Sequence, residues 1–117
     1  MTDVAVTHKH RSMTDIVTVS IACANDAEAQ TIARLLVEQC LAGCVQFHPI
    51  HSTYIWQGAV ESAAEIMLTA KTVTAKLPAI EAAVMAVHSY DVPEILAQPV
   101  VWCSESYAAW LHNVLEG

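Results

Sequence analysis

The feature that most restricts the fold is a long β-hairpin pattern in the middle of the chain. Residues 44–47 and 52–56 predict two parts of one strand, residues 57–58 are a Gln-Gly turn signal, and residues 65–73 alternate between two faces as the returning strand. Strict alternation indicates a half-buried strand, and a short Gly-containing link indicates a hairpin. Pro49 removes a backbone donor, so we expect a bulge or an edge position there.

A hairpin of this length must project from a small domain. The chain has 117 residues, of which 55% are hydrophobic, and its mean hydropathy is +0.40. A domain of this size has little interior in which to bury such residues. We therefore expect the apolar tip of the hairpin to be buried against another subunit.

The segment before the hairpin predicts a strand followed by a helix. Residues 16–23 alternate between apolar and small or polar side chains. Asn25 then stands three residues before Glu28, which is the spacing of a capping box at the start of a helix. An apolar helical stripe follows, and Gly43 is its expected C-terminal stop.

The segment after the hairpin predicts a helix over residues 74–87, a strand over residues 95–102 and a last helix capped by Ser104. Two interleaved βαβ units with right-handed connections form a ferredoxin-like sandwich. The predicted fold is thus an α+β ferredoxin-like βαββαβ sandwich with a long projecting hairpin and an extra C-terminal helix. We expect it to occupy residues 14–117, after a disordered arm at residues 1–13.

Charge and hydropathy argue against several classes of function. The net charge is −7, and eleven acidic residues but only three basic ones follow Met13. Such a surface repels phosphate backbones, so no nucleic-acid partner is expected. Residues 39–60 are the longest uncharged stretch, and their polar residues and proline make them a poor membrane span. The first twelve residues lack a secretory pattern, so a cytoplasmic location is expected.

Neither the cysteines nor the short motifs indicate an enzyme. The four cysteines contain no Cys-x2-Cys pair, which argues against a zinc ribbon or a thioredoxin-type site. In a cytosolic protein they are expected to be free thiols. The chain has no Gly-rich phosphate loop, no Gly-x-Ser-x-Gly and no His-Glu-x-x-His motif. We therefore expect no catalytic site and no organic cofactor.

Chemically reactive side chains gather in a short segment between the second helix and the last strand. His88, Tyr90, Asp91 and Glu94 supply an imidazole, a phenol and two carboxylates, and Pro93 prevents a helix. Loops held by a rigid scaffold often carry binding groups. The segment either binds a ligand or caps the helix and hydrogen-bonds its neighbours, and both interpretations stay open.

Several motifs along the chain occur in a characteristic order and spacing. They are Cys44-Val45, Pro49, Tyr54-x-Trp56-x-Gly58, Lys71-Thr72, His88-x-Tyr90-x-x-Pro93-Glu94-Ile95, Pro99-Val100 and Tyr107-x-x-Trp110. In this order the chain resembles the CutA-type divalent-cation tolerance proteins over residues 16–115. The resemblance implies the ferredoxin-like fold, a tight homotrimer with hairpins paired between subunits, and binding of, or tolerance to, copper and other divalent metals.

The resemblance also implies a metal site. Its ligands would be His88 and Glu94 of the loop and Cys23 of the first strand, a nitrogen, oxygen and sulfur set that suits copper or zinc. The chain departs from the family at this loop. It has Ser89 and Asp91 where the family commonly has proline and glutamate.

Six other residues are candidates for lining a ligand cleft or a subunit interface. These candidates are Tyr54, Trp56, Lys71, Tyr90, Asp91 and Trp102. PII-like signalling proteins resemble this architecture and bind ligands between subunits, so a small-molecule sensor is one alternative function. A structural assembly or anchoring protein is another. His48 and His51 could ligate one ion together only if a bulge at Pro49 turned them to the same side.

Overall fold

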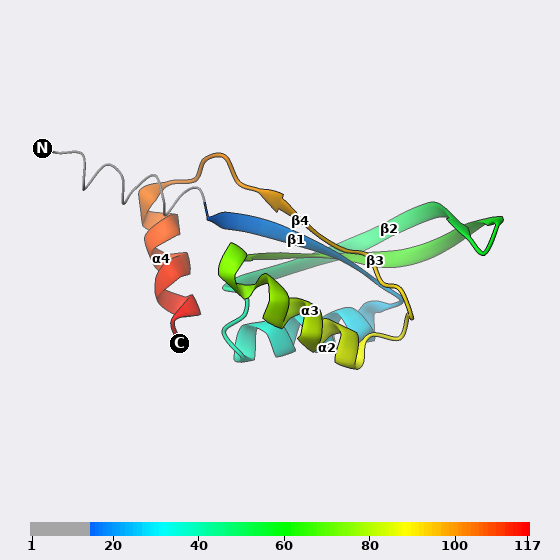
Figure 1. Ribbon diagram of the computed structural model, residues 1–117, viewed down its shortest axis with the longest axis horizontal. Coiled ribbons are helices and arrows are strands. Elements are labelled where there is room, and N and C mark those ends of the chain that lie inside the picture. Colours follow the sequence, from blue (N-terminus) through cyan, green and yellow to red (C-terminus); the bar gives the residue numbers. More distant parts are fainter. Residues whose placement is uncertain (1–14) are drawn as a thin grey trace, which may run out of the picture.

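The computed structural model describes residues 15–117, and the predicted arm at residues 1–13 lies outside this part of the chain. The elements are β1 (Ile16–Cys23), α2 (Asp26–Glu38), β2 (Cys44–Trp56), β3 (Ala59–Val73), a 3₁₀ turn (Thr74–Lys76), α3 (Leu77–Val87), β4 (Ile95–Pro99) and α4 (Glu105–Leu115). Figure 1 shows α2 and α3 together on one face of the sheet, with α4 at the end opposite the hairpin tip.

The four strands form one antiparallel sheet in the order β2-β3-β1-β4. Strands β1 and β3 are central, and β2 and β4 are the two edges. With two helices on one face, this order is the ferredoxin-like arrangement. The predicted α+β class, long hairpin and C-terminal helix are confirmed.

The hairpin extends well beyond the rest of the sheet. Strands β2 and β3 pair continuously from Cys44↔Lys71 to Trp56↔Ala59, whereas β1 pairs with β3 only as far as Cys23↔Ile66. The part of the hairpin beyond this point projects to one side, and the molecule measures 59 × 27 × 22 Å (Figure 1). The turn uses positive φ angles at residues 57 and 58, which suit a two-residue hairpin turn.

Of the two outcomes expected at Pro49, a bulge or an edge position, the edge position is confirmed. The register passes through the Pro49↔Ile66 pair without an extra residue, so no bulge is present. Proline is accommodated because β2 is an edge strand with no neighbour on its outer side. His48 and His51 therefore lie on opposite faces of a regular strand, which excludes their joint ligation of one ion.

The core lies between the sheet and its two covering helices. Ile21 and Leu68 of the sheet and Ile32, Leu36 and Ile80 of the helices are each fully buried. Each such side chain contributes about 1.5–3 kcal/mol by leaving water. This core holds the end of β1 beside the start of α2 and the end of α3. The candidate site lies where these three segments meet.

The ends of two elements differ from the sequence expectation. Helix α2 ends at Glu38, and Cys40, not Gly43, takes the left-handed conformation with φ of 56°. Gly43 serves packing instead, because a Cβ there would lie 2.5 Å from Cδ1 of Leu111 in α4. Strand β4 ends at Pro99, and the backbone N–H of Val100 still donates to the carbonyl oxygen of Ile16, the first residue of β1.

A second cluster anchors α4 to the sheet through Ile16, Val73, Ala108, Leu111 and Leu115. Within residues 15–117, none of the helices combines the length and the apolar character that crossing a membrane requires.

Candidate metal centre

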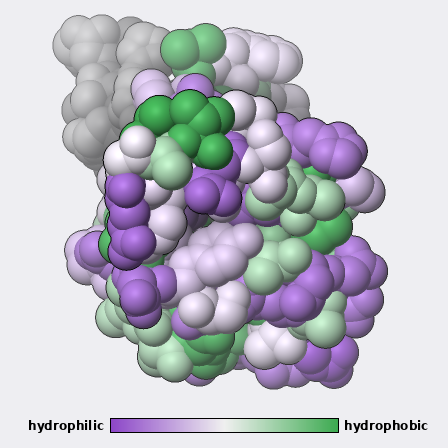
Figure 2. All heavy atoms as spheres, turned by 90° about the vertical axis from the view of Figure 1, so that its right-hand side faces the viewer, coloured by the Kyte–Doolittle hydropathy of each residue, from purple (hydrophilic) through white to green (hydrophobic). Residues whose placement is uncertain are grey.

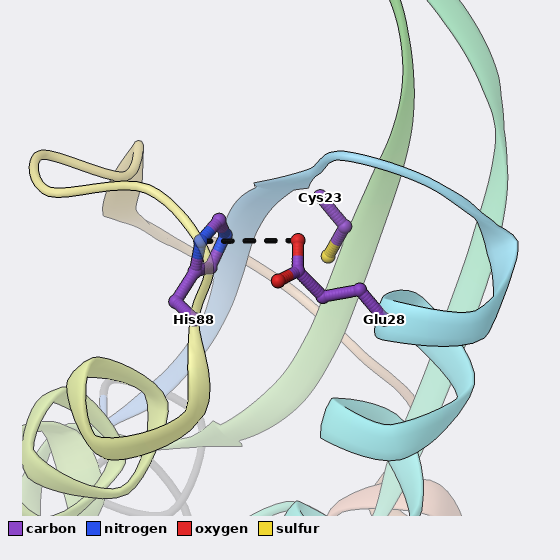
Figure 3. Close-up of side chains that lie close together, drawn as sticks. All are labelled: Cys23, Glu28 and His88. Atoms are coloured by element: carbon purple, nitrogen blue, oxygen red, sulfur yellow. Dashed lines mark ion pairs between the residues drawn. The ribbon is translucent and has the colours of Figure 1, made fainter.

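Three side chains with metal-binding atoms meet where the end of β1 lies beside the loop after α3. Cys23 ends β1, Glu28 stands in the first turn of α2, and His88 follows α3. Their sulfur, carboxylate oxygen and ring nitrogen all lie within 4.8 Å of one another. Figure 3 shows the side chains approaching one another from these three elements. No other such group of three or more residues occurs in the described part of the chain.

The buried ring of His88 makes hydrogen bonds through both nitrogens. Nε2 lies 2.8 Å from the carbonyl oxygen of Ala22, and Nδ1 lies 3.0 Å from the backbone nitrogen of Tyr90. A carbonyl oxygen only accepts, so in the neutral ring Nε2 carries the proton and Nδ1 accepts from Tyr90 N–H. Nδ1 also lies 3.8 Å from a carboxylate oxygen of Glu28. Nδ1 is thus the ring atom that could bind a metal through its lone pair.

Glu28 links two loops through its two carboxylate oxygens. Oε1 accepts from the backbone N–H of Ala24 at 2.8 Å, and Oε2 accepts from the backbone N–H of Ser89 at 2.7 Å. Burial acts to raise the pKa of Glu28, but the hydrogen bonds from Ala24 and Ser89, with His88 nearby, outweigh it and lower the pKa. The carboxylate is therefore ionised at neutral pH and ties the start of α2 to the loop after α3.

Cys23 supplies a fully buried thiol. Its Sγ lies 3.8 Å from the carbonyl oxygen of Ile21, a weak hydrogen bond. Burial raises the pKa of Cys23 to about 12, and the negative charges of Glu28 and Glu65 add to this effect. The thiol keeps its proton at neutral pH, so a metal must displace that proton in order to bind the sulfur.

The structure brings together two of the three metal ligands expected from the sequence. Cys23 and His88 meet, whereas Glu94 is not part of the group and lines a separate cavity. Glu28 stands beside Cys23 and His88 instead. The sequence carried a signal for Glu28, because a capping-box residue in the first turn of a helix lies close to the end of the preceding strand. Its spacing from Asn25 predicts only a capping role.

The cavity beside this centre lies between the projecting hairpin and the loop. Its volume is about 760 Å³. Four of the predicted cleft residues, Tyr54, Trp56, Tyr90 and Asp91, line it together with Glu94. Lys71 and Trp102 do not. Lys71 lies at the opposite end of the hairpin, paired with Cys44, and Trp102 follows β4 with 71% of its surface exposed.

Tyr90 joins the metal centre to the cavity. Its ring lies against His88 with centroids 4.9 Å apart, and its hydroxyl donates to Oε2 of Glu65 at 2.8 Å. Burial, together with the hydrogen bond to Glu65 and the charge of that residue, raises the pKa of Tyr90 well above its usual range. The phenol therefore stays protonated and holds the loop against β3.

These features define a ferredoxin-like α+β protein with a buried thiol, carboxylate and imidazole at one end of its sheet. The chain belongs to the CutA1 divalent ion tolerance protein family, whose sequence model matches residues 17–114. The predicted family is therefore confirmed.

Relatives and solved structures agree with this assignment. A divalent-cation tolerance protein CutA from Thermus thermophilus is 41% identical over 96 residues, which cover 81% of this chain and 93% of that protein. Protein CutA of Mus musculus is 39% identical over 97 residues. A solved CutA structure from Archaeoglobus fulgidus superposes with a TM-score of 0.84 at 32% identity and covers 86% of this chain and 98% of that one.

The mammalian relatives are longer proteins. The match to the mouse protein covers 82% of this chain but only 55% of that protein. The chain thus spans about half the length of the curated mammalian relatives that it matches.

Proposed function

We propose that this protein binds a divalent transition metal through Cys23, Glu28 and His88, and that the preferred metal is copper. We also propose that this binding contributes to the tolerance of metal ions. The observation that carries the proposal is the convergence of one sulfur, one oxygen and one nitrogen donor within 4.8 Å. Such a mixed set suits copper or zinc, which take three or four ligands. The name of the Thermus thermophilus relative supports the link to divalent cations.

Binding would change the hydrogen bonds of the centre. A metal on Nδ1 of His88 displaces the N–H of Tyr90, and a metal on Glu28 competes with the N–H groups of Ala24 and Ser89. The thiol of Cys23 must also release its proton. Each lost hydrogen bond costs about 1 kcal/mol, so the metal must offset several such losses.

We further propose a homotrimer in which the projecting hairpins meet. Large apolar side chains are exposed on the hairpin and along the β4 edge, namely Tyr54, Ile55, Trp56, Val60, Val92, Leu96, Val101 and Trp102. Figure 2 views the molecule from the hairpin end and shows hydrophobic and pale side chains interrupting the hydrophilic surface. Both edge strands also present backbone groups that another chain can pair. The cytoplasmic location and the absence of enzymatic activity remain predictions.

Titration calorimetry with Cu²⁺ and Zn²⁺ tests the metal proposal. We expect saturable binding that weakens by about tenfold or more in His88→Ala and in Cys23→Ser, because each change removes a ligand. His51→Ala is the matched control, since it removes an exposed imidazole of β2 that is not one of the three candidate ligands. Equal affinity in the parent protein, His88→Ala and Cys23→Ser would rule out this centre.

The cavity supports a second candidate function, the binding of a small molecule. Its volume and aromatic walls are those of a ligand pocket, not of a metal site. A protein that binds neither metal nor small molecule would favour the assembly role.

A further inference from the structure

We propose that the loop at residues 88–94 is autoinhibitory, because its docked backbone occupies donor atoms that a metal needs and metal binding releases it. This loop lies between α3 and β4 and contains neither helix nor strand. The inference rests on the proposed function, since it concerns how a metal reaches Cys23, Glu28 and His88. It adds that the docked loop and the bound metal exclude each other.

The strictest competition occurs at the ring of His88. In the neutral ring Nε2 donates to the carbonyl oxygen of Ala22, which leaves a single lone pair on Nδ1. That lone pair already accepts the backbone N–H of Tyr90 at 3.0 Å. One lone pair cannot serve a hydrogen bond and a metal at the same time. Ligation by Nδ1 therefore requires the backbone of Tyr90 to move away from the ring.

A second competition occurs at the carboxylate of Glu28. Its Oε2 accepts the backbone N–H of Ser89 at 2.7 Å, so two consecutive loop residues are held by two of the candidate ligands. Figure 3 shows the ring of His88 and the carboxylate of Glu28 facing each other at this point. A carboxylate has further lone pairs, so a metal weakens this hydrogen bond by reducing the charge on the oxygen. Both effects act on the same short segment of the loop.

The phenol of Tyr90 extends the effect to the sheet. Its hydroxyl donates to Oε2 of Glu65 at 2.8 Å, and the loop forms one wall of the cavity beside the hairpin. A loop that leaves the metal centre must also give up this hydrogen bond to β3. Coupling between two equilibria is reciprocal. Metal binding thus loosens the loop, and a change that loosens the loop raises the affinity for metal.

Amide hydrogen exchange, measured by NMR with and without Zn²⁺, tests the release directly. We expect saturating Zn²⁺ to speed the exchange of the N–H groups of Ser89 and Tyr90 by about tenfold or more. The N–H of Thr74 is the internal control. It donates to the carbonyl oxygen of Asp15 at the opposite end of the sheet, so its rate should not change.

The same spectra separate this proposal from the metal centre itself. If Zn²⁺ shifts the signals of Cys23 and Glu28 but leaves the exchange of Ser89 and Tyr90 unchanged, the autoinhibitory role is wrong and the metal centre stands. If Zn²⁺ shifts none of these signals, the metal centre is wrong and the role of the loop falls with it.

A substitution at Ser89 tests the competition from the side of the loop. Ser89→Pro removes the N–H that Glu28 accepts, and the extended backbone of His88, with φ of −74° and ψ of 141°, suits a following proline. Calorimetry should show that Zn²⁺ binds this variant about threefold to tenfold more tightly than the parent protein. Ser89→Ala keeps the N–H and is the matched control, for which a smaller gain is expected. Unchanged or weaker affinity in a folded Ser89→Pro variant would overturn the proposal.

Tyr90→Phe provides a test that does not depend on the folding of Ser89→Pro. It removes only the hydroxyl that donates to Glu65, and neither residue is a candidate ligand. A merely structural role would leave the affinity for Zn²⁺ unchanged or lower it, whereas the autoinhibitory role predicts binding tighter by about twofold to tenfold. Tyr107→Phe removes a phenol hydroxyl from α4 and should have no effect. Unaltered affinity in Tyr90→Phe, or an equal gain in Tyr107→Phe, would contradict the proposal.

Discussion

Tyr90 contacts both the metal centre and the cavity between the hairpin and the loop after α3, and each of these two regions contains a largely buried carboxylate. Glu28 in the metal centre accepts two backbone hydrogen bonds and lies near His88, so both of its oxygens are occupied. Glu65 in the cavity accepts a single hydrogen bond from Tyr90. The two carboxylates thus differ in the number of hydrogen bonds that they accept from the chain itself.

This contrast has a consequence for binding. A ligand at the metal centre must break existing hydrogen bonds and remove a proton from Cys23, so its affinity depends on pH and on competition with the backbone. Glu65, by contrast, has only its hydrogen bond from Tyr90 to lose. One loop, residues 88–94, therefore borders a centre that has to rearrange in order to bind a metal and a cavity whose carboxylate is held by a single hydrogen bond.

The largest expected effect is the loss of the Glu28 carboxylate. Glu28→Ala removes the acceptor for the N–H groups of both Ala24 and Ser89, and we expect it to lower the free energy of unfolding by about 3 kcal/mol. Urea denaturation monitored by circular dichroism measures this change. Glu38→Ala is the control, because its ion pair with Arg34 is exposed and contributes at most about 0.5 kcal/mol.

The contribution of Glu28 also has a defined pH dependence. Its pKa is lowered in the folded state, so its stabilisation is present above the usual value near 4.5 and is lost as the pH falls through the folded pKa. The difference in stability between the parent protein and Glu28→Ala should narrow over that acidic range. A difference that stays constant down to pH 3 would contradict the role of the ionised carboxylate.

A smaller effect is expected on the cavity side. Tyr90→Phe removes the only hydrogen bond that Glu65 receives within the described chain, and we expect a loss of about 1–2 kcal/mol. Water entering the cavity can replace the lost donor, which keeps the loss below that of Glu28→Ala. The same denaturation experiment compares the two variants. If Tyr90→Phe lowered the free energy of unfolding as much as Glu28→Ala does, Glu65 would contribute as much to stability through its one hydrogen bond as Glu28 does through two.

The most gradual effect is the pH dependence of metal affinity. Burial holds the pKa of Cys23 at about 12, so metal binding releases one proton from this thiol. Between pH 7 and pH 8.5 we expect the affinity for Zn²⁺ to rise about tenfold per pH unit. Calorimetry in buffers of different ionisation enthalpy counts the released protons. Cys23→Ser should lower that count by one, and an unchanged count would show that the sulfur is not a ligand.

Sequence patterns predicted local structure well where one element decides the outcome. Asn25 caps α2 as expected, since its side chain accepts from the backbone N–H of Glu28 at 2.9 Å. The Gln57-Gly58 turn closes the hairpin for the same local reason. The prediction that Gly43 ends the helix is wrong, because the small size of this residue is required by Leu111, which lies far away in the chain.

The candidate site was predictable only in part. The cluster of groups at residues 88–94 marked the correct loop, and His88 and Tyr90 both take part in it. Glu94 was expected beside His88, yet the loop directs it into the cavity and Glu28 lies beside His88 instead. The burial that raises the pKa of Cys23 is likewise a property of the packed core, not of the residues next to it in sequence.

Periodicity, caps and turn residues determined the order of strands and helices, because each acts over a few neighbouring residues. The tertiary structure alone decided which carboxylate meets which ring. That choice depends on three chain segments that converge at the end of β1, and their distances are set by the packing of α2 and α3 on the sheet. The same packing places Glu65 in the wall of the cavity with Tyr90 as its hydrogen-bond partner, which no local pattern in the sequence encodes.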